Sequence, residues 1–212
     1  MVSGILLGAG ESKRMGRNKL LLSWGKGTIF DRCLQILLRS HLDEVVAVLN
    51  PKSPEVRNRI ERLPEVLKKR VRIILNPGFQ QGMSSSIRMG LRQIHPASDG
   101  ALFALGDQPL LRAGTINALI HVFGGDQNRI VVPFYQGRRG NPVLFGRTYF
   151  KELMETRGDS GGRLILEHHP DQVIRYRTQS GAVLFDIDTW EEYGKAQSSR
   201  LKAIDIKRQE DK

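Results

Sequence analysis

The sequence has little cysteine, and its hydrophobic runs are short. Cys33 is the single cysteine among 212 residues, which leaves no partner for an internal disulfide and no cysteine cluster for zinc. The apolar run Met1–Leu7 contains Ser3 and Gly4 and is shorter than a signal segment or a membrane span requires. We therefore expect a cytoplasmic protein that does not associate with membranes.

Acidic residues are fewer than basic residues, and aromatic residues are few. The 22 Asp and Glu residues stand against 33 Lys and Arg residues, which gives a formal net charge of +11 and indicates an anionic partner. Aromatic residues make up 7% of the chain, and none is interleaved with the basic loops, as stacking on single-stranded nucleic acid would need. We therefore expect small phosphorylated partners and no nucleic acid. A basic nucleic-acid-binding module is the alternative of a different class.

Two familiar phosphate-binding motifs are absent. No Gly-x4-Gly-Lys-Ser/Thr string occurs, so the chain has no Walker A loop. In the glycine-rich loop that follows the first apolar run, Lys13 stands where a dinucleotide fingerprint requires its third glycine or alanine. Any phosphate site in this loop must therefore be of another type.

Short apolar runs alternate with helix-length amphipathic stretches, as in a parallel sheet with crossover helices. The predicted strands are Val2–Leu7, Glu44–Leu49, Val71–Leu75, Ala101–Leu105 and Ile130–Pro133. The predicted helices between them are Ile29–Ser40, Pro54–Leu67, Ser85–Ile94 and Thr115–Phe123. This α/β pattern predicts a three-layer α/β/α, Rossmann-like fold with a mostly parallel twisted sheet.

The alternation breaks after Pro133. The pattern then predicts a tight turn at Gly137–Gly140, a strand at Asn141–Phe145, helices at Arg147–Glu155 and Ser160–His168, strands at Val173–Arg177 and Ala182–Ile187, and a last helix capped by Thr189. No linker divides the chain. We predict a single domain over residues 1–197 and a charged, frayed tail over residues 198–212.

Three loops are expected to meet at one edge of the sheet. The run Ala101–Leu105 has no polar alternation, so we expect both of its faces to be buried in the centre of the sheet. Ligands in open α/β sheets bind outside the carboxyl ends of the strands. The loops Gly8–Lys19, Asn76–Ser86 and Gly106–Pro109 should therefore face one crevice.

The loop after the first predicted strand has the composition of an anion site. Glycines directly after a strand let backbone N–H groups approach an anion, and Gly8, Gly10 and Gly16 would supply that cradle. Arg14 and Lys19 would neutralise a polyphosphate. The alternative is a structural turn with solvated basic residues.

Two other loops offer groups for metal and nucleoside binding. Asp107, at the end of the predicted central strand, can hold Mg²⁺, which typically takes one or two protein carboxylates; the alternative is an Asx-turn or helix-cap aspartate. The segment Gly82–Ser86 offers hydroxyls and backbone groups to a base or ribose; the alternative is a helix N-cap.

Strings of the first loop resemble one family. They are Leu7-Gly8-Ala9-Gly10, Ser12, Arg14-Met15-Gly16 and Lys19-Leu20-Leu21-Leu22. The loop resembles the signature loop of nucleotidyltransferases that build activated cofactors and sugars. It is most similar to that of the MocA-like CTP:molybdopterin cytidylyltransferases, a sister group of the MobA guanylyltransferases.

Further matches to this family run along nearly the whole chain. They are Asn76-Pro77-Gly78-Phe79, Gly82-Met83-Ser84-Ser85-Ser86, Gly106-Asp107-Gln108-Pro109, Gly140-Asn141-Pro142-Val143-Leu144-Phe145, Gly158-Asp159-Ser160-Gly161 and Asp186-Ile187-Asp188-Thr189. Guanylyl-transferring relatives usually carry a double glycine where this chain has Gly8-Ala9-Gly10, and they lack the segment that holds Gly82, Met83 and Ser86. These loops favour the cytidylyl branch. In one departure, Asn141 stands where relatives commonly have His.

The resemblance implies a nucleotidyltransferase that uses Mg²⁺, or Mn²⁺, to transfer CMP from CTP to the phosphate of a molybdopterin-type cofactor with release of pyrophosphate. It assigns catalysis to Arg14, Lys19 and Asp107. It implies a nucleotide site made of Leu7, Gly8, Ala9, Gly10, Ser12, Arg14, Met15, Gly16, Lys19, Gly82, Met83, Ser86 and Gly106. The implied metal ligands are Asp107 and Asp188, with Asp186 as substitute because alternate residues of an extended segment share a face. Helix N-capping is the alternative role for Asp186 and Asp188.

The resemblance also implies an acceptor-binding part built from the predicted hairpin and helix. We expect its residues to be Gln108, Pro109, Arg138, Arg139, Gly140, Asn141, Asp159 and Arg163. Solvated surface charge is the alternative for the basic members. A molybdoenzyme or its maturation chaperone is the partner that would receive the product. Two alternative functions stay open: transfer from GTP or another nucleotide to a different phosphorylated acceptor, and non-catalytic delivery of a cofactor.

Overall fold

The computed structural model describes residues 1–199. Residues 190–199 are helical, so the start of the segment predicted as a frayed tail belongs to a helix, and the rest of that prediction, residues 200–212, lies outside the described residues. Within residues 1–199 no helix is long and apolar enough to cross a membrane. One domain over residues 1–197 stays a prediction.

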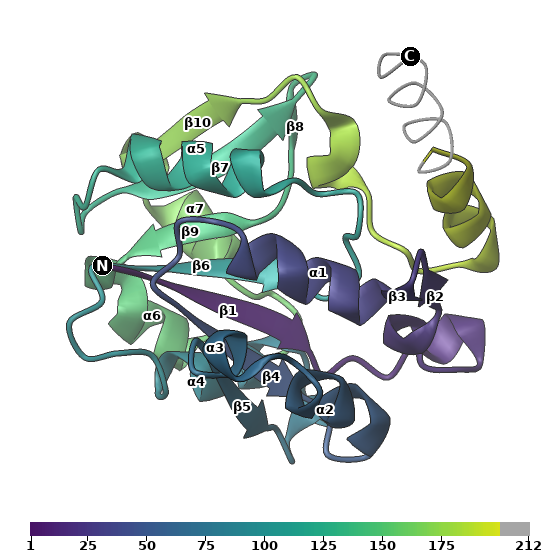
Figure 1. Cartoon of the computed structure of the whole chain (residues 1–212). Helices are drawn as coiled ribbons and strands as arrows, with labels where there is room; N and C mark the ends of the chain where they lie inside the picture. Colours follow the sequence, from purple (N-terminus) through teal and green to yellow (C-terminus); the bar gives the residue numbers. More distant parts are fainter. Residues whose placement is uncertain (200–212) are drawn as a thin grey trace.

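The centre of the molecule is a twisted sheet of eight strands (Figure 1). The path across it is β10-β7-β9-β6-β1-β4-β5, and β8 pairs with β7. Strand β9 is antiparallel to β6 and β7, whereas β1, β4, β5 and β6 are mutually parallel. The strands are β1 (Val2–Gly8), β4 (Glu44–Leu49), β5 (Val71–Leu75), β6 (Gly100–Leu105), β7 (Ile130–Tyr135), β8 (Arg138–Arg139), β9 (Val143–Gly146) and β10 (Val173–Arg177). A separate ribbon pairs β2 (Ser23–Trp24) with β3 (Gly27–Thr28).

Helices cover both faces of the sheet, which confirms the predicted three-layer α/β/α arrangement (Figure 1). Helices α1 and α5 pack on one face, and α4 and α6 pack on the other. The helices are α1 (Ile29–Leu38), α2 (Pro54–Glu61), α3 (Glu65–Lys68), α4 (Met83–Leu91), α5 (Ala113–Phe123), α6 (Phe150–Glu155) and α7 (Arg163–His168). Short 3₁₀ turns are η1 (Lys13–Met15), η2 (Lys19–Leu21), η3 (Phe79–Gln81), η4 (Arg147–Tyr149), η5 (Pro170–Gln172) and η6 (Gly181–Leu184).

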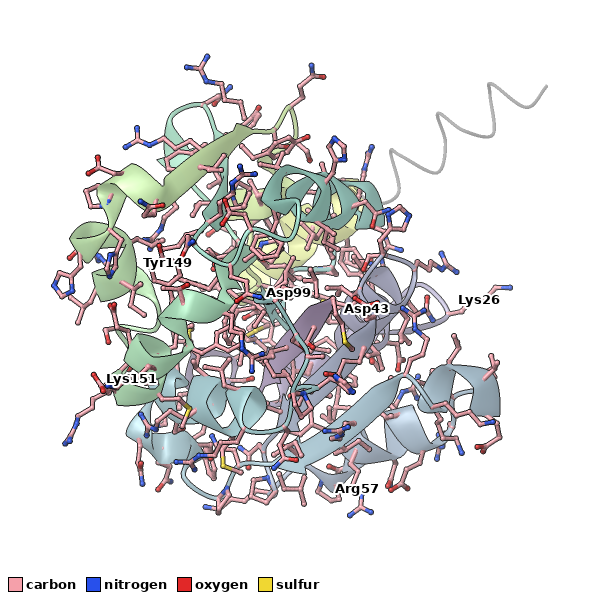
Figure 2. The ribbon with its side chains drawn as sticks, turned by 90° about the vertical axis from the view of Figure 1, so that its left-hand side faces the viewer. Lys26, Asp43, Arg57, Asp99, Tyr149 and Lys151 are labelled. Carbon is pink, nitrogen blue, oxygen red and sulfur yellow. The ribbon has the colours of Figure 1, made fainter. Side chains whose placement is uncertain are left out.

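The core lies on the two faces of the central strands. In β1, Ile5 joins the cluster under α4 whereas its neighbour Leu6 joins the cluster under α1, as the alternation of side chains along a strand requires. Charged side chains stay outside this core: Lys26, Arg57 and Lys151 project outward from the ribbon (Figure 2). Strand β6 lies between β9 and β1, which confirms the central position expected from its unbroken apolar run.

Local signals account for the main differences from the predicted helices. The helix predicted at Pro54–Leu67 is two helices, because Pro64 cannot continue α2 and instead precedes α3. Helix α4 begins at Met83, two residues before the predicted start. Helix α1 begins as expected, and a capping box fixes its start: the Thr28 hydroxyl accepts from the Asp31 N–H, and the Asp31 carboxylate accepts from the Thr28 N–H.

Two predictions in the second half are wrong. The tight turn predicted at Gly137–Gly140 is centred two residues earlier, because Gln136 and Gly137 both have positive φ and join β7 to β8 as a two-residue hairpin. The strand predicted at Ala182–Ile187 is the 3₁₀ turn η6 followed by an extended segment outside the sheet. Its apolar residues pack onto the core without ladder partners, since Val183 and Ile187 are fully buried.

Candidate active site

A crevice of about 540 Å³ lies at the carboxyl ends of β1 and β6, and we refer to it below simply as the crevice. The three loops expected to converge all contribute to it. Its lining residues are Leu7, Gly8, Ala9, Gly10, Glu11, Ser12, Lys13, Arg14, Lys19, Leu20, Phe79, Gln80, Gly82, Met83, Ser86, Leu105, Gly106, Asp107, Asp159, Asp186 and Asp188. The crevice therefore lies where ligands bind in open α/β sheets.

The conformation of the loop after β1 is fixed by contacts within the loop and with the core. Ser12 and Gly16 both adopt left-handed φ values, 54° and 66°, at the two ends of η1. The Ser12 hydroxyl accepts a hydrogen bond of 3.1 Å from the N–H of Lys19, which closes the loop into a ring. The side chain of Met15 is buried and anchors the loop to the core. Met15 and Gly16 thus shape the loop from outside the crevice, whereas Gly8 and Gly10 line it.

Lys19 joins two acidic segments that are far apart in the sequence. Its Nζ donates to Oδ2 of Asp107 and, at 2.6 Å, to Oδ1 of Asp188. The Arg14 guanidinium reaches Oδ2 of Asp188 at 2.7 Å. Because Asp107 follows β6 and Asp188 precedes the helix of residues 190–199, this cluster ties the C-terminal part of the chain to the first loop. The sequence-predicted catalytic residues Arg14, Lys19 and Asp107 therefore lie together.

Burial and charge shift the pKa values of this cluster in different directions. Burial raises the pKa of the Asp107 carboxyl, against the effect of the neighbouring Lys19 ammonium. Burial also disfavours the charged form of Lys19, but Asp107 and Asp188 outweigh it and raise the pKa of the amine. For Asp188, Lys19 and Arg14 outweigh burial and hold its pKa below the ordinary value. At neutral pH Lys19 and Asp188 are therefore charged.

Asp186 differs from Asp107 and Asp188 in its hydrogen-bond partner. Its Oδ1 accepts a hydrogen bond of 2.5 Å from Nε2 of Gln108. Burial, together with the nearby Asp107 carboxylate, raises the pKa of Asp186 to about 6. Asp186 and Asp107 therefore both hold a proton more readily than Asp188 does.

The donors in the crevice fit a hard divalent cation. Oδ1 of Asp107 is buried and has no hydrogen-bond partner, so it is free to coordinate a metal. Mg²⁺ prefers oxygen ligands, keeps several waters and needs only one or two carboxylates. Within residues 1–199 no group of three or more His, Cys, Asp or Glu residues is arranged as a metal cage. The arrangement therefore fits a cation shared between the protein and a bound phosphate.

The loop before α4 is braced by a loop from the second half of the chain. Gly82 has φ of 89°, and a Cβ there would lie 2.5 Å from the carbonyl carbon of Gly158. The N–H of Met83 donates to Oδ1 of Asp159, and the N–H of Ser84 donates to the carbonyl of Gly158, each at 3.0 Å. Only glycine fits at position 82, and Asp159 satisfies the first amide of α4.

Cys33 lies in α1 beneath the crevice. It is fully buried, and burial together with the Asp107 carboxylate raises the pKa of its thiol. The thiol is therefore protonated and enclosed, as its apolar helical context predicts.

A family model described as the MobA-like NTP transferase domain matches residues 4–173. The chain belongs to this family. The match spans β1 to the start of β10 and includes the first loop, the Gly82 loop and the turn that carries Asp107. It confirms the family resemblance and assigns the chain to the nucleotidyltransferases.

Curated relatives of this MobA-like chain carry several names. The chain is 31% identical to the purine catabolism protein PucB of Bacillus subtilis (strain 168), over 90% of this chain and 93% of that protein. It is 30% identical to the nicotine blue oxidoreductase of Paenarthrobacter nicotinovorans, over 90% and 94%. It is 22% identical to the molybdenum cofactor cytidylyltransferase of Escherichia coli (strain K12), over 89% and 92%.

Solved structures share the fold. One, a homologue of Rv0371c from Mycobacterium sp. strain JC1, is 28% identical with a TM-score of 0.81 over 95% of this chain and 98% of that one. Another is Rv0371c of Mycobacterium tuberculosis H37Rv in complex with manganese, which is 27% identical with a TM-score of 0.74 over 93% and 98%.

The structure separates most of the residues predicted to bind an acceptor from the crevice of this MobA-like chain. Asp159 lines the crevice, and Gln108 lies buried behind it. The others lie elsewhere: Arg138 and Arg139 are exposed on β8, Gly140 and Asn141 pack against Val183, Arg163 pairs with Glu167, and Pro109 lines a different cavity. Their role in acceptor binding stays a prediction.

Sequence reasoning missed part of the lining. Phe79 and Gln80 in η3, Glu11 and Lys13 in the first loop face the crevice but were not among the predicted site residues. The signal for Phe79 was available, because Asn76-Pro77-Gly78-Phe79 is one of the strings that carry the resemblance. Without the fold, nothing indicated that Phe79 would line the crevice.

Proposed function

We propose that this chain transfers CMP from CTP to the phosphate of a molybdopterin-type cofactor and releases pyrophosphate. The observation that carries the proposal is the cluster at the carboxyl end of β6: Asp107, whose Oδ1 has no partner, pairs with Lys19, and Lys19 and Arg14 both pair with Asp188. A nucleotidyl transfer needs this combination of oxygen donors for a divalent metal and cations for a triphosphate.

Asp107 and Asp188 are the proposed metal ligands. Both have an oxygen directed at the position that the Lys19 ammonium holds, and Asp107 has a second oxygen without a partner. Asp186 is occupied by Gln108 and is the less suitable ligand. A bound Mg²⁺ or Mn²⁺ would supply charge neutralisation on the phosphates of the nucleotide. The solved relative in complex with manganese supports a divalent cation.

Arg14 and Lys19 are the proposed triphosphate ligands. Lys19 is bound to Asp107 and Asp188, the two carboxylates that would hold a divalent cation. A bound triphosphate would offer the Lys19 ammonium new anionic partners. The guanidinium of Arg14 is about two-thirds exposed and can turn from Asp188 to a phosphate. Both cations then stabilise the charge that develops on the leaving pyrophosphate.

The cradle for the nucleotide is proposed from two loops. Gly8, Ala9 and Gly10 leave room for a phosphate to approach the backbone, since a Cβ at position 10 would meet nothing within 4 Å. Gly82 and Ser86 present backbone and hydroxyl groups for the nucleoside, and Met83 offers an apolar edge. The relative named molybdenum cofactor cytidylyltransferase supports CTP as the nucleotide and a pterin cofactor as the acceptor.

The terminal phosphate of the acceptor attacks the α-phosphorus directly in this proposal, with no covalent intermediate on the protein. The chain holds the two substrates in line, keeps the leaving group neutralised and contributes no nucleophile. Cys33, enclosed and protonated, does not take part. A cytoplasmic location and transfer of the product to a molybdoenzyme or its maturation chaperone belong to the same proposal.

A pyrophosphate-release assay tests the proposal. Purified protein with Mg²⁺ is supplied with each of the four nucleoside triphosphates, with and without a molybdopterin-type cofactor. We expect release only with CTP and only with the acceptor present. Release with GTP would replace the cytidylyl assignment by a guanylyl one. No release with any nucleotide, while isothermal titration still detects nucleotide binding, would favour non-catalytic cofactor delivery.

A further inference from the structure

A second large cavity lies next to the crevice, bounded by the second half of α1, the start of α5 and η6. Its volume is about 970 Å³, within the range of small-molecule sites. We call it the arginine cavity. It is lined by Trp24, Gly25, Arg32, Ile36, Arg39, Pro109, Leu110, Arg112, Ala113, Ser180, Gly181, Ala182, Phe185 and Ser199.

Three arginines face this cavity, and no acid balances them. Neither Asp nor Glu is among the lining residues, and within residues 1–199 none of Arg32, Arg39 and Arg112 forms an ion pair. Arg32 is half-buried, and its Nε donates to the carbonyl of Pro109 at 3.2 Å. Burial, then the charges of Arg39 and Arg112, lower the pKa of Arg32.

Arginines without an ion pair also occur elsewhere on the surface, but these three share one cavity whose lining has no acid. Arg59, on α2, lines another cavity, but there Asp31 binds it through both carboxylate oxygens. Guanidinium groups that share a concave site without carboxylates repel one another, and an anion that bridges them relieves this repulsion. Guanidinium also matches phosphate in shape, with two parallel hydrogen bonds.

The remaining walls favour a ligand with a flat apolar part. Trp24 and Phe185 contribute aromatic surface, Ile36 and Leu110 contribute aliphatic surface, and Ser180 contributes a hydroxyl. Arginine and aromatic side chains together bind phosphorylated heteroaromatic molecules through charge and stacking.

We propose that the arginine cavity is a second nucleotide site, which binds a nucleoside diphosphate or triphosphate with its phosphates on Arg32, Arg39 and Arg112. The site does not depend on the function proposed for the crevice. It is distinct from the crevice, because the two sets of lining residues have no member in common.

Two segments connect the arginine cavity to the crevice. Pro109 follows Asp107 by two residues, and Phe185 directly precedes Asp186. Along the extended residues 185–188, Asp186 and Asp188 line the crevice whereas Phe185 lines the arginine cavity. The Gln108–Asp186 hydrogen bond ties the two segments to each other. An occupant of the arginine cavity therefore contacts the same segments that carry the aspartates of the crevice.

Calorimetric titration of the full chain with ADP tests the site. The test variant is Arg39→Ala/Arg112→Ala. The matched control is Arg175→Ala/Arg177→Ala, which removes the same charge from exposed positions of β10, away from both cavities. We expect the test variant to lose one bound ADP per chain, or at least tenfold in affinity at that site, while the control binds as the wild type does.

The number of sites lost separates this proposal from the function of the crevice. If the crevice also binds ADP, the wild type has two sites and the test variant one; if it does not, the numbers are one and none. Equal binding by the test variant and the wild type would overturn the proposal. Equal weakening in the test variant and the control would overturn it too, because the effect would then come from net charge alone.

Discussion

The crevice and the arginine cavity are neighbours that two segments of the chain connect, but their charges are arranged in opposite ways. In the crevice both cations proposed for catalysis have an acidic partner: Arg14 pairs with Asp188, and Lys19 pairs with Asp107 and Asp188. In the arginine cavity three guanidinium groups have none among residues 1–199. A paired cluster suits a site that must accept a divalent cation and a polyanion together, since partners can be exchanged without leaving a charge uncompensated. An unpaired cluster suits a site that accepts an anion alone.

Removing the carboxylate at the centre of the crevice should have the largest effect. Asp107→Asn keeps the size of the side chain but removes the metal ligand and leaves Lys19 with Asp188 only. We expect pyrophosphate release to fall by roughly 10³-fold, because the charge on the triphosphate is then poorly neutralised. Steady-state rates measured at saturating CTP and Mg²⁺ check this, with thermal unfolding as the control for the fold. Near wild-type turnover would contradict the role of Asp107.

Replacing Lys19, which bridges Asp107 and Asp188, should lower turnover but raise the affinity for a divalent metal. Lys19→Met preserves the length of the side chain without its charge. We expect turnover to fall by roughly 10²-fold. The affinity for Mn²⁺ without nucleotide should rise by about tenfold, because the ammonium no longer competes for Asp107 and Asp188.

Electron paramagnetic resonance of free Mn²⁺ gives the metal affinity of this variant independently of activity. Weaker Mn²⁺ binding by Lys19→Met than by the wild type would show that the ammonium does not occupy the metal position. The Asp107→Asn protein is the control, since it should bind Mn²⁺ poorly with or without nucleotide.

Asp186 gives a further test of the charges in the crevice, through the pH dependence of the free energy of unfolding. The pKa of Asp186 is raised to about 6, so between pH 4 and pH 6 the folded state binds this proton more tightly than the unfolded chain does. Its contribution to stability therefore falls as the pH rises through about 6. Asp186→Asn, which can still accept from Gln108, should be more stable than the wild type at pH 8 by on the order of 2 kcal/mol. Near pH 4 the two proteins should be equal.

Urea unfolding of both proteins at pH 4, 6 and 8 measures this difference. Other groups titrate in both proteins, so the comparison isolates Asp186. A difference that is constant with pH would mean that the pKa of Asp186 is not raised.

The smallest expected effect concerns the brace on the loop before α4. Asp159→Ala removes the acceptor of the Met83 N–H and so loosens the loop that is proposed to bind the nucleoside. The substitution leaves Lys19 and the aspartates around it unchanged. Loss of a cap of this kind costs about 1 kcal/mol, so we expect nucleotide affinity to fall about fivefold. Asp159→Asn retains an oxygen acceptor and should restore most of the affinity in the same calorimetric titration.

The crevice was largely predictable because its parts are carried by short local patterns. Buried strands such as β6 are legible from their unbroken apolar residues, and parallel strands bring their carboxyl ends to one edge. That topology is enough to bring the Gly8 loop, the Gly82 loop and Asp107 together. Asp188 came from the family resemblance, since its pairing with Lys19 spans 169 positions and has no local signal.

The arginine cavity had no such signal. Arg32, Arg39 and Arg112 come from α1 and from the segment before α5, and each is an ordinary basic residue in its own sequence context. What distinguishes them is that, among residues 1–199, they line one cavity to which no acid contributes, and the sequence does not express this grouping. The strand predicted around Val183 was wrong for a related reason. Apolar residues indicate that a segment is buried, but a buried segment can be a 3₁₀ turn as well as a strand.

The position of Cys33 has a practical consequence for experiments on both regions. Because the chain's only thiol is enclosed in α1 and protonated, maleimide reagents have no reactive group to attach to in the native wild-type protein. A single change such as Ser180→Cys at the rim of the arginine cavity therefore creates a unique attachment point for a fluorescent or paramagnetic reporter. No prior removal of native cysteine is needed, so occupancy of the cavity can be followed in an otherwise unaltered chain.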